Sequence, residues 1–459
     1  MPATFLHNYR SLSDAPRRFL VFASLNVLSW HSIVGPVLVL FARHIDMPPS
    51  WVGVVVSFVP LSMLLAFITV PLVEWLGPKR LMLITWAGRY LISACAFSLP
   101  WVLWYGHPRF GWIVLLFSVL GFCLIRSMGV GGWYPWLHEI VQPAERSRYF
   151  GAESSVEHGV IVITNLMHVF VLSFHATLYH YLGIYGVGVG CGLLSMLLLA
   201  RVPGGKETPP HARAGLAGIS RGMYRAVLAD REFLVFVGLA ACGLMAIAFL
   251  NTSSVMFMRD ALGIKPQIVM LILTANSTGV FLTVRYWSVY AEHQGVAHGV
   301  FLTMGGLGAL ALALVFQGPA FAWTPYVLAP ILVAAASLAA AYSVIMQRAM
   351  LDYVRAESRV AYTNIWILGA ALSLGLSPIA VGFSIDALDL WGYRLCFVVC
   401  ACAALTVCVL GRVLLHQPLT GESSAPSGVN LLSPVHAVAR ILWISAGLHP
   451  SAKSIRQRD

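Results

Sequence analysis

Charged residues are scarce in this chain. They make up 10% of its 459 residues, whereas a soluble domain of ordinary composition carries about 25%. The charges that remain are concentrated in short segments between apolar runs of roughly 20 residues, the length that crosses the hydrocarbon core of a bilayer. The mean hydropathy of +0.80 agrees with this pattern. The composition therefore excludes a soluble multidomain protein and indicates a polytopic protein whose surroundings are a lipid bilayer.

Motifs of pumps and enzymes are also absent from the sequence. There is no G-x-x-x-x-G-K-[ST] nucleotide-binding loop, so we do not expect this chain to pump with ATP. The 15 histidines are scattered without the spacing of metal ligands. The eight cysteines all fall within apolar runs, where cysteine acts as a small hydrophobic residue. We expect no enzymatic activity, no cofactor and no metal site.

Twelve apolar runs predict an all-α polytopic membrane protein with twelve transmembrane helices. The runs cover residues 18–43, 50–73, 81–105, 112–137, 151–175, 181–201, 233–258, 267–290, 299–317, 325–348, 361–385 and 394–415. The long gap between the sixth and seventh runs begins with prolines and glycines and continues with a basic stretch, which indicates a linker with an amphipathic helix. We therefore expect an N-terminal six-helix bundle over 1–201, a linker over 202–232, a C-terminal six-helix bundle over 233–415 and a tail over 416–459. Because charged residues precede a long first apolar run, no cleavable signal peptide is expected.

The basic residues predict the orientation in the membrane. With the N-terminus inside, 21 of the 29 Lys and Arg residues fall in inside segments, five fall outside and three lie within the helices. This asymmetry satisfies the positive-inside rule, so we expect both termini to be cytoplasmic in a cell inner membrane. The net charge of +11 is explained by inside loops that face an anionic leaflet, without a nucleic-acid partner. We expect a monomer.

A short polar motif occurs once in each half of the chain. The gap after the second run reads EWLGPKR and contains Glu74, Gly77 and Lys79-Arg80. The gap after the eighth run reads EHQGVAH and contains Glu292 and Gly295. Both copies have the pattern acid-x-x-G-x-x-base, and about half the chain length separates them. A turn duplicated within a duplicated set of helices indicates a transporter built from two similar halves.

A second polar element repeats with nearly the same separation. It reads HEIVQPAERSRYFGAES over residues 138–154 and LDYVRAESRVAYTN over residues 351–364. The matched positions are Glu139 with Asp352, Val141 with Val354, Glu145 with Glu357, and Ser147-Arg148 with Ser358-Arg359.

These two elements resemble the major facilitator superfamily. The loop from Glu74 to Arg80 is similar to the superfamily signature G-x-x-x-D-R-x-G-R-[KR] in its acid, its glycine and its basic end. It departs from that signature at Val70, Trp75 and Pro78. The stretch WYPWLHEIVQPAERSRYFG, residues 133–151, resembles bacterial members with a tryptophan-rich end to the fourth helix. The resemblance covers about residues 18–415 and implies two six-helix bundles around a central cavity that opens alternately to each side.

The repeated loops are candidates for a cytoplasmic gate. A carboxylate at one helix end and cations after a glycine turn can bridge neighbouring helix ends and stabilise one conformation. The alternative is that these residues only set topology and form a tight turn. The candidate gate residues are Glu74, Gly77, Lys79, Arg80, Glu139, Arg146, Arg148, Glu292, Gly295, Asp352 and Arg359.

Polar residues within the apolar runs are candidates for substrate binding or coupling, because they are costly in the membrane. Arg126 lies near the middle of the fourth run, among glycines. It is either a cation that binds an anionic substrate or the partner of Glu153 or Glu157. Arg89 in the third run is expected to have a structural role.

The start of the fifth run is the main candidate for proton coupling. Glu153, Glu157 and His158 lie close together there, and burial would raise the proton affinity of a carboxylate. The alternative is a salt-bridge network with Arg146 and Arg148.

Other polar side chains could line the cavity. Asn26 and His31 in the first run and Asn251 in the seventh are candidates, with Asn276 a weaker one. The alternative for these residues is hydrogen bonding between helices.

The function that best fits the sequence is secondary active transport of a small organic solute by alternating access. Such transport would be driven by a proton gradient or by exchange, and its substrate could be anionic. The alternative is a membrane sensor or assembly factor that keeps the fold without transporting. An integral-membrane enzyme is disfavoured, because no catalytic cluster is present. The sequence does not identify the substrate.

Overall fold

The structure is a computed structural model that describes residue 9 and residues 11–106, 108–142, 145–205, 225, 227–318, 324–354 and 359–415. Helices dominate these ranges, and no β-strand occurs within them. Most of the predicted linker and the whole predicted tail lie outside the described residues.

The N-terminal half contains six helical passes, several of which are interrupted. Its elements are α2 (Asp14–Ile33), α3 (Val37–His44), α4 (Pro49–Ser62), η1 (Met63–Ile68), α5 (Thr69–Leu76), α6 (Pro78–Ser93), η2 (Ala94–Ser98), α7 (Leu99–Tyr105), α8 (Pro108–Val130), α9 (Trp133–Ile140), α10 (Arg146–Phe174) and α11 (Leu178–Ala200). The C-terminal half contains α13 (Arg231–Met256), the π-helical η6 (Phe257–Ala261), α14 (Pro266–Gln294), α15 (Val296–Val315), α16 (Thr324–Tyr353), α17 (Arg359–Leu388) and α18 (Leu390–Leu414).

Each of the twelve predicted runs corresponds to one helix or to a series of consecutive helices. Within the described residues, eleven passes are long and apolar enough to cross a membrane. The second predicted run is the exception, because its apolar helical stretch is the shorter Pro49–Leu65. Pro60 lies inside α4 and the 3₁₀ segment η1 follows it. Proline removes a backbone hydrogen bond and disturbs the preceding turn, so this pass is divided among α4, η1 and α5.

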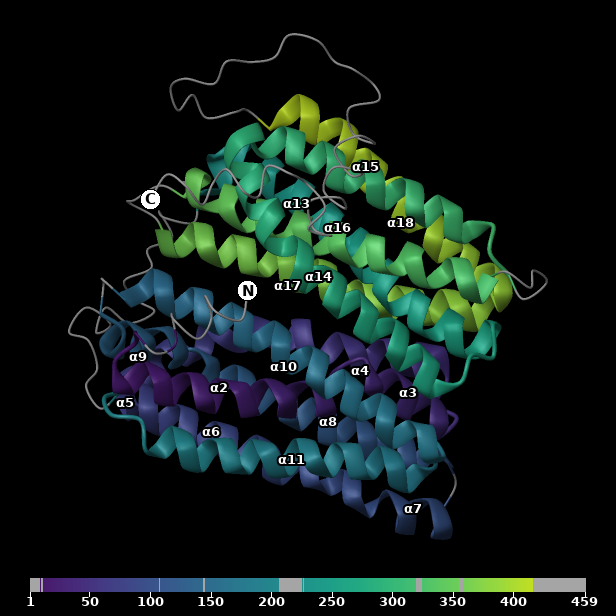
Figure 1. The fold of residues 1–459 in the computed structure, drawn as a ribbon, viewed down its shortest axis with the longest axis horizontal. Coiled ribbons are helices and arrows are strands. Elements are labelled where there is room, and N and C mark those ends of the chain that lie inside the picture. The colour runs from purple at the N-terminus through teal and green to yellow at the C-terminus, as the bar shows by residue number, and fades with distance from the viewer. Residues whose placement is uncertain are drawn as a thin grey trace, which may run out of the picture.

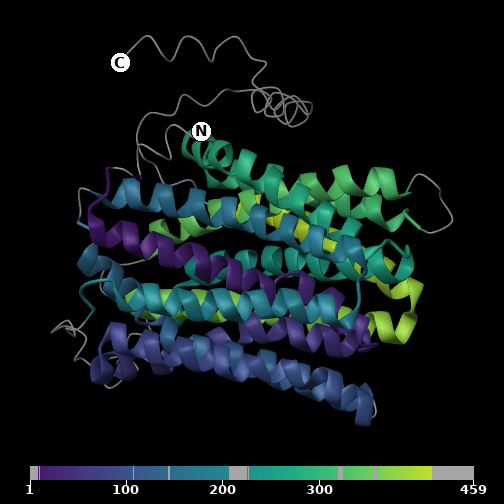
Figure 2. The same ribbon diagram turned by 60° about the horizontal axis from the view of Figure 1, so that its bottom comes forward.

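The two halves pack side by side and meet through two pairs of helices. In Figure 1 the N-terminal half lies below in purple and blue, and the C-terminal half lies above in green and yellow. Across the boundary, α4 contacts α17 and α10 contacts α14. Figure 2 shows the same helices running roughly parallel to one long direction. The protein therefore has two helical bundles with a helix-lined boundary between them.

The duplicated polar turn has the same backbone shape in both halves. Gly77 has φ 76° and ψ 154°, and Gly295 has φ 81° and ψ 162°. Each glycine begins the next helix, α6 or α15. Positive φ is strained for residues with a Cβ atom, so glycine at both positions permits the same sharp reversal. The repeat in the sequence thus corresponds to a repeat in the structure.

Candidate functional site

The helices of both halves end at two opposite sides of the molecule, here named the linker end and the Arg43 end. The linker end contains the turns at Gly77 and Gly295 and the end of α11. The Arg43 end contains the end of α3 and the beginnings of α8 and α14. In Figure 1 the linker end is on the left, near α5 and α9, and the Arg43 end is on the right, near α3 and α7.

A cavity of about 420 Å³ lies between the two halves. Residues from both halves line it, and its walls include α2, α3, α4, α10, α13, α14 and α16. The cavity size falls within the range of small-molecule sites. The polar side chains around it are His31, Asn165, Asn251, Thr252, Ser254, Asn276 and Ser277. The described lining residues include no charged side chain.

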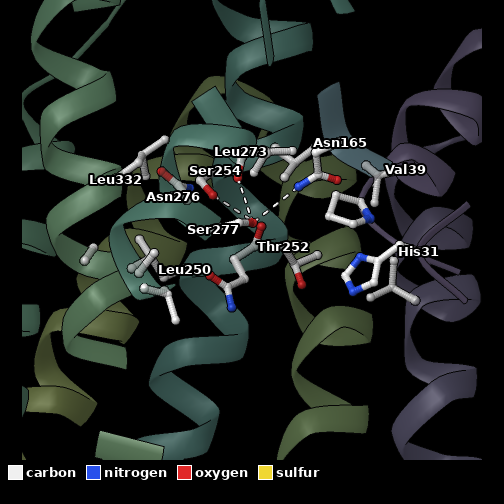
Figure 3. Close-up of a pocket in the computed structure, with 18 of the residues that line it drawn as sticks. His31, Val39, Asn165, Leu250, Thr252, Ser254, Leu273, Asn276, Ser277 and Leu332 are labelled. Atoms are coloured by element: carbon white, nitrogen blue, oxygen red, sulfur yellow. Dashed lines mark hydrogen bonds between the residues drawn. The ribbon is translucent and has the colours of Figure 1, made fainter. Parts of the chain in front are cut away.

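A helix break forms one wall of the cavity. Between α2 and α3 the chain passes through Gly35 and Pro36, and both residues line the cavity. Proline cannot donate the backbone hydrogen bond that would continue the helix. His31 lies one turn before this break and points toward the cavity in Figure 3. Interrupted helices beside a cavity are a feature of transporter binding sites.

A hydrogen-bond chain crosses the boundary in the cavity wall. Asn165 Nδ2 of α10 donates to Ser277 Oγ of α14 at 3.3 Å. Ser277 Oγ in turn donates to the Leu273 carbonyl within α14 at 3.0 Å. Figure 3 shows these bonds beside Asn276, with Ser254 and Thr252 on the neighbouring α13. The two halves are therefore in polar contact at the cavity itself.

Arg126 lies next to the cavity but does not line it. Its guanidinium carbon is 4.1 Å from the ring centroid of Trp30, and Trp30 is a lining residue. Its Nη1 also lies 3.5 Å from Met63 Sδ. Among the described residues Arg126 forms no ion pair with Glu153 or Glu157. In this conformation the partner of the guanidinium is therefore the Trp30 ring, and both roles considered for Arg126, anion binding and pairing with a carboxylate, stay predictions.

Asn26 is located inside the N-terminal bundle rather than at the cavity. Its Oδ1 accepts a hydrogen bond of 2.5 Å from Arg89 Nη2. The Arg89 guanidinium is fully buried and packs on the rings of Trp86 and Phe122. In this conformation Asn26 therefore makes a hydrogen bond between helices, which is the alternative considered for it, and the structural roles of Asn26 and Arg89 stay predictions. His31 and Asn251 do line the cavity.

The polar residues at the start of α10 have different partners in this conformation, and their role in coupling stays a prediction. Glu153 Oε1 accepts a hydrogen bond of 3.4 Å from the Tyr149 hydroxyl, whereas Glu157 is exposed. His158 Nδ1 lies 2.8 Å from the Ser154 carbonyl. The His158 ring is also 6.2 Å from the ring of Phe281 in the opposite half. These residues lie between the linker end and the cavity.

The halves are joined by polar contacts at the Arg43 end. Arg43 Nε lies 2.9 Å from Asp260 Oδ2, and Arg259 Nη1 donates to the Leu40 carbonyl. Leu40 lies in the middle of the short helix α3, so this bond ties the α3 backbone to the other half. The backbone N–H of Ser50, at the start of α4, donates to Asp386 Oδ2 of α17 at 2.9 Å. Each of these contacts holds a helix of one half to the other half.

Close backbone packing accompanies these contacts. A Cβ atom on Gly53 would lie 2.1 Å from the Pro378 carbonyl oxygen, and one on Gly382 would lie 2.3 Å from the Pro49 carbonyl oxygen. The contacts are reciprocal between α4 and α17, which run in opposite directions. Only glycine allows the two backbones to approach this closely.

Two of the predicted gate residues at the linker end hold the beginning of the linker. Glu139 Oε2 accepts from the Gly205 N–H at 2.8 Å. Lys79 Nζ donates to the Val202 carbonyl at 2.5 Å and lies over the Trp136 ring. Trp136 Nε1 donates to the Pro203 carbonyl at 3.0 Å. These contacts fasten residues 202–205 to the N-terminal half.

The other predicted gate residues are only partly described. Arg80 is exposed at the start of α6, and Arg148 is half-buried near the start of α10. The side chains of Glu74, Arg146, Glu292, Asp352 and Arg359 lie outside the described residues. Their role at the gate stays a prediction.

Sequence reasoning missed four residues of the cavity wall and the Arg43 end. Asn165, Ser277, Arg43 and Asp260 were not selected as site residues. Asn165 offered a signal, because it is an amide in the middle of an apolar helix and such residues are costly there. Arg43 and Asp260 offered little signal, since charges at helix ends are ordinary in membrane proteins.

The sequence matches no known protein-family model and no curated protein. Solved structures do share the fold. The nucleoside transporter NupG, in a mutant form, superimposes with a TM-score of 0.67 at 11% identity, over 88% of this chain and 100% of that one. A bacterial homolog of the human lysosomal transporter Spinster, in an inward-facing unoccupied conformation, gives 0.62 at 15% identity, over 88% and 97%. A POT family transporter in complex with 5-aminolevulinic acid gives 0.65 at 10% identity, over 87% and 96%.

These likenesses cover most of the chain and, together with the helical passes, confirm the predicted fold. The chain is a multi-pass helical membrane protein with the fold of the major facilitator superfamily transporters.

Proposed function

We propose that this protein is a secondary active transporter that moves a small organic solute by alternating access. The observation that carries this proposal is the cavity between the two halves, whose polar wall is contributed by both of them. A solute bound there contacts both bundles, so its binding can favour one relative arrangement of the halves over another.

The contacts at the Arg43 end act as the closed gate of this conformation. Arg43–Asp260, Arg259–Leu40 and Ser50–Asp386 hold the halves together there. For the solute to leave on that side, these contacts must break and α4 must separate from α17. The charge asymmetry of the sequence assigns the linker end to the cytoplasm. The conformation is then closed to the outside.

The predicted linker-end gate would form in the opposite conformation. Glu74, Glu292 and Asp352, with the basic residues that follow them, lie at helix ends of both halves. Ion pairs between such ends would close the cytoplasmic side when the Arg43 end opens.

Coupling to protons is proposed through Glu153. Its carboxylate lies within the α10 pass and has the Tyr149 hydroxyl as a partner. A carboxylate in an apolar helix binds a proton more readily than one in water, and α10 belongs to the boundary between the halves. Exchange of one solute for another is the alternative driving reaction, and it needs no titrating group.

Flux from reconstituted vesicles tests the proposal. Proteoliposomes are loaded with a broad mixture of small organic solutes, and each solute remaining inside is measured over time with and without a pH gradient. We expect at least one solute to leave faster than from protein-free vesicles. Equal retention of every solute in both kinds of vesicle would favour the non-transporting sensor or assembly factor.

A further inference from the structure

The cavity wall contains buried polar atoms that the protein itself does not satisfy. Within the described part of the chain, Asn165 Oδ1, Asn276 Oδ1 and His31 Nδ1 have no hydrogen-bond partner. All three residues line the cavity, and the Asn165 side chain belongs to a residue that is only 2% exposed. Buried polar groups are nearly always hydrogen-bonded in native structures. Eleven buried side-chain atoms lack a partner in the described residues, and these three are the ones whose residues share a cavity large enough for a ligand that could supply the missing partners.

The orientation of the Asn165 amide defines what its partner must be. Ser277 has one hydroxyl proton, and it is donated to the Leu273 carbonyl. Ser277 Oγ can therefore only accept from Asn165, which requires the Asn165 Nδ2 group to face Ser277. The opposite amide orientation would place two acceptors against each other. Asn165 Oδ1 is thus left as a free acceptor, and its missing partner is a donor.

The charge of the cavity further restricts the ligand. No charged side chain occurs among its described lining residues, and the nearby Arg126 guanidinium is covered by Trp30. Burying an unpaired anion or cation in such a wall would be very costly. Acceptors without a neighbouring charge instead suit hydroxyl or neutral N–H groups. Apolar lining residues such as Val34, Val56 and Leu332 leave room for a less polar part of the ligand.

We infer that the substrate is a neutral solute with several hydrogen-bond donors, of the polyhydroxyl or nucleoside-like class. Asn165 Oδ1 and Asn276 Oδ1 accept two of its donors. This inference rests on the proposed transport function and names its substrate class. Asn165 belongs to the N-terminal half and Asn276 to the C-terminal half, so such a solute bridges the two halves. An anionic substrate held by Arg126 is the competing possibility.

Ligand-induced thermal stabilisation of the purified full chain tests this inference. The probes are matched pairs that differ by one phosphate: uridine and uridine 5′-monophosphate, ribose and ribose 5-phosphate, myo-inositol and myo-inositol 1-phosphate, glycerol and glycerol 3-phosphate. We expect at least one neutral member to stabilise the protein more than its phosphate. Methylation of the hydroxyls of that compound should weaken binding about tenfold or more, because its donors are removed.

Variants locate the binding in the cavity. Asn165→Leu and Asn276→Leu should each weaken binding of that neutral compound about tenfold or more. Asn165→Ser is the milder variant if the leucine variant does not fold. Ser277→Ala should also weaken binding, since it releases the Asn165 amide. Ser253→Ala is the matched control, because the Ser253 hydroxyl bonds to the Phe249 carbonyl of its own helix at 2.6 Å and Ser253 is not among the residues that line the cavity. This control variant should bind the neutral compound with an affinity within about twofold of that of the wild type.

Three results would overturn the inference. These are stronger stabilisation by the phosphates, no stabilisation by any of the eight compounds, or neutral binding that both asparagine variants retain. The first and third would leave the proposed transport function in place. The second result, no stabilisation by any of the eight compounds, would not by itself disprove transport. The vesicle experiment tests transport separately, because it uses a broad solute mixture and not these probes.

Discussion

Arg43 Nε and Asp260 Oδ2 lie 2.9 Å apart and connect the end of α3 in one half to η6 in the other. Their side chains are 21% and 18% exposed, so the pair is largely shielded from water. Asp260 also accepts from the Tyr393 hydroxyl at 3.5 Å. The pair therefore lies at the centre of the contacts that close the Arg43 end.

Removing the Asp260 charge should open that end more often. Asp260→Asn weakens the pair with Arg43, and a pair of this kind is worth on the order of 1 kcal/mol. This corresponds to a shift of about fivefold toward the conformation that is open at the Arg43 end. Spin-label distances across that end would measure the shift. Exchanging the charges, with Arg43→Asp and Asp260→Arg together, should restore part of the closed population. An unchanged distance distribution in Asp260→Asn would show that the pair does not hold the gate.

Gly53 should be required for closure of the same end. Gly53→Ala would place a methyl group 2.1 Å from the Pro378 carbonyl oxygen, so α4 and α17 could not keep their approach. We expect fewer closed molecules and slower transport. Gly190→Ala is the matched control, because no atom lies within 4 Å of a Cβ at Gly190. It should fold and transport normally, since alanine is the better helix former by about 1 kcal/mol. If Gly53→Ala and Gly190→Ala have the same closed population and the same transport rate, the α4–α17 contact is not needed for closure.

Arg126 should stabilise the protein through Trp30 and not through Glu157. A buried cation–aromatic contact is worth about 2 kcal/mol, so Arg126→Ala should lower the thermal stability and loosen a wall of the cavity. Glu157→Gln should change stability little, because Glu157 is exposed. In a double-mutant cycle, Arg126→Ala with Glu157→Gln should give no coupling energy, whereas Arg126→Ala with Trp30→Leu should give a clear one. A coupling energy between Arg126 and Glu157 would instead support the carboxylate pair, one of the two alternatives that the sequence leaves open for Arg126.

Glu153 should matter for the driving force and not for the fold. Glu153→Gln keeps the hydrogen-bonding shape of the side chain but cannot exchange a proton. We expect vesicles with this variant to lose acceleration by a pH gradient while retaining exchange of solute across the membrane. The matched control is Glu157→Gln, one turn further along the same helix. If Glu153→Gln responds to the gradient as the wild type does, the proton is carried elsewhere or exchange alone drives the reaction.

The sequence predicted the fold well because bilayer-spanning helices depend on local composition. Each helix must be apolar along its length and satisfy its own backbone hydrogen bonds, so its position can be read without knowing its neighbours. The repeated glycine turn was recognised for the same reason. Gly77 and Gly295 are short-range signals, and their shared positive φ is a local property.

The cavity was predicted less completely because it depends on how each helix is rotated. Asn26 and His31 are five residues apart in α2, which places them about 140° apart around the helix. His31 consequently faces the cavity while Asn26 faces Arg89. Composition does not reveal that rotation. Contacts such as Asn165 with Ser277 and Arg43 with Asp260 join distant parts of the chain, and no local pattern in a single sequence indicates such partners.

Alternating access is the central claim, and distances at both ends of one reconstituted protein test it most directly. Spin labels carried by unnatural amino acids would replace Arg109 and Lys265 at the Arg43 end, and Arg80 and Glu232 at the linker end. All four residues are exposed. Pulsed electron paramagnetic resonance spectroscopy then gives the distance distribution at each end, across a range of pH and with transported solutes present. We predict two populations that change in opposite directions, so that one end narrows as the other widens. A single unchanging distance at each end under every condition would contradict the account.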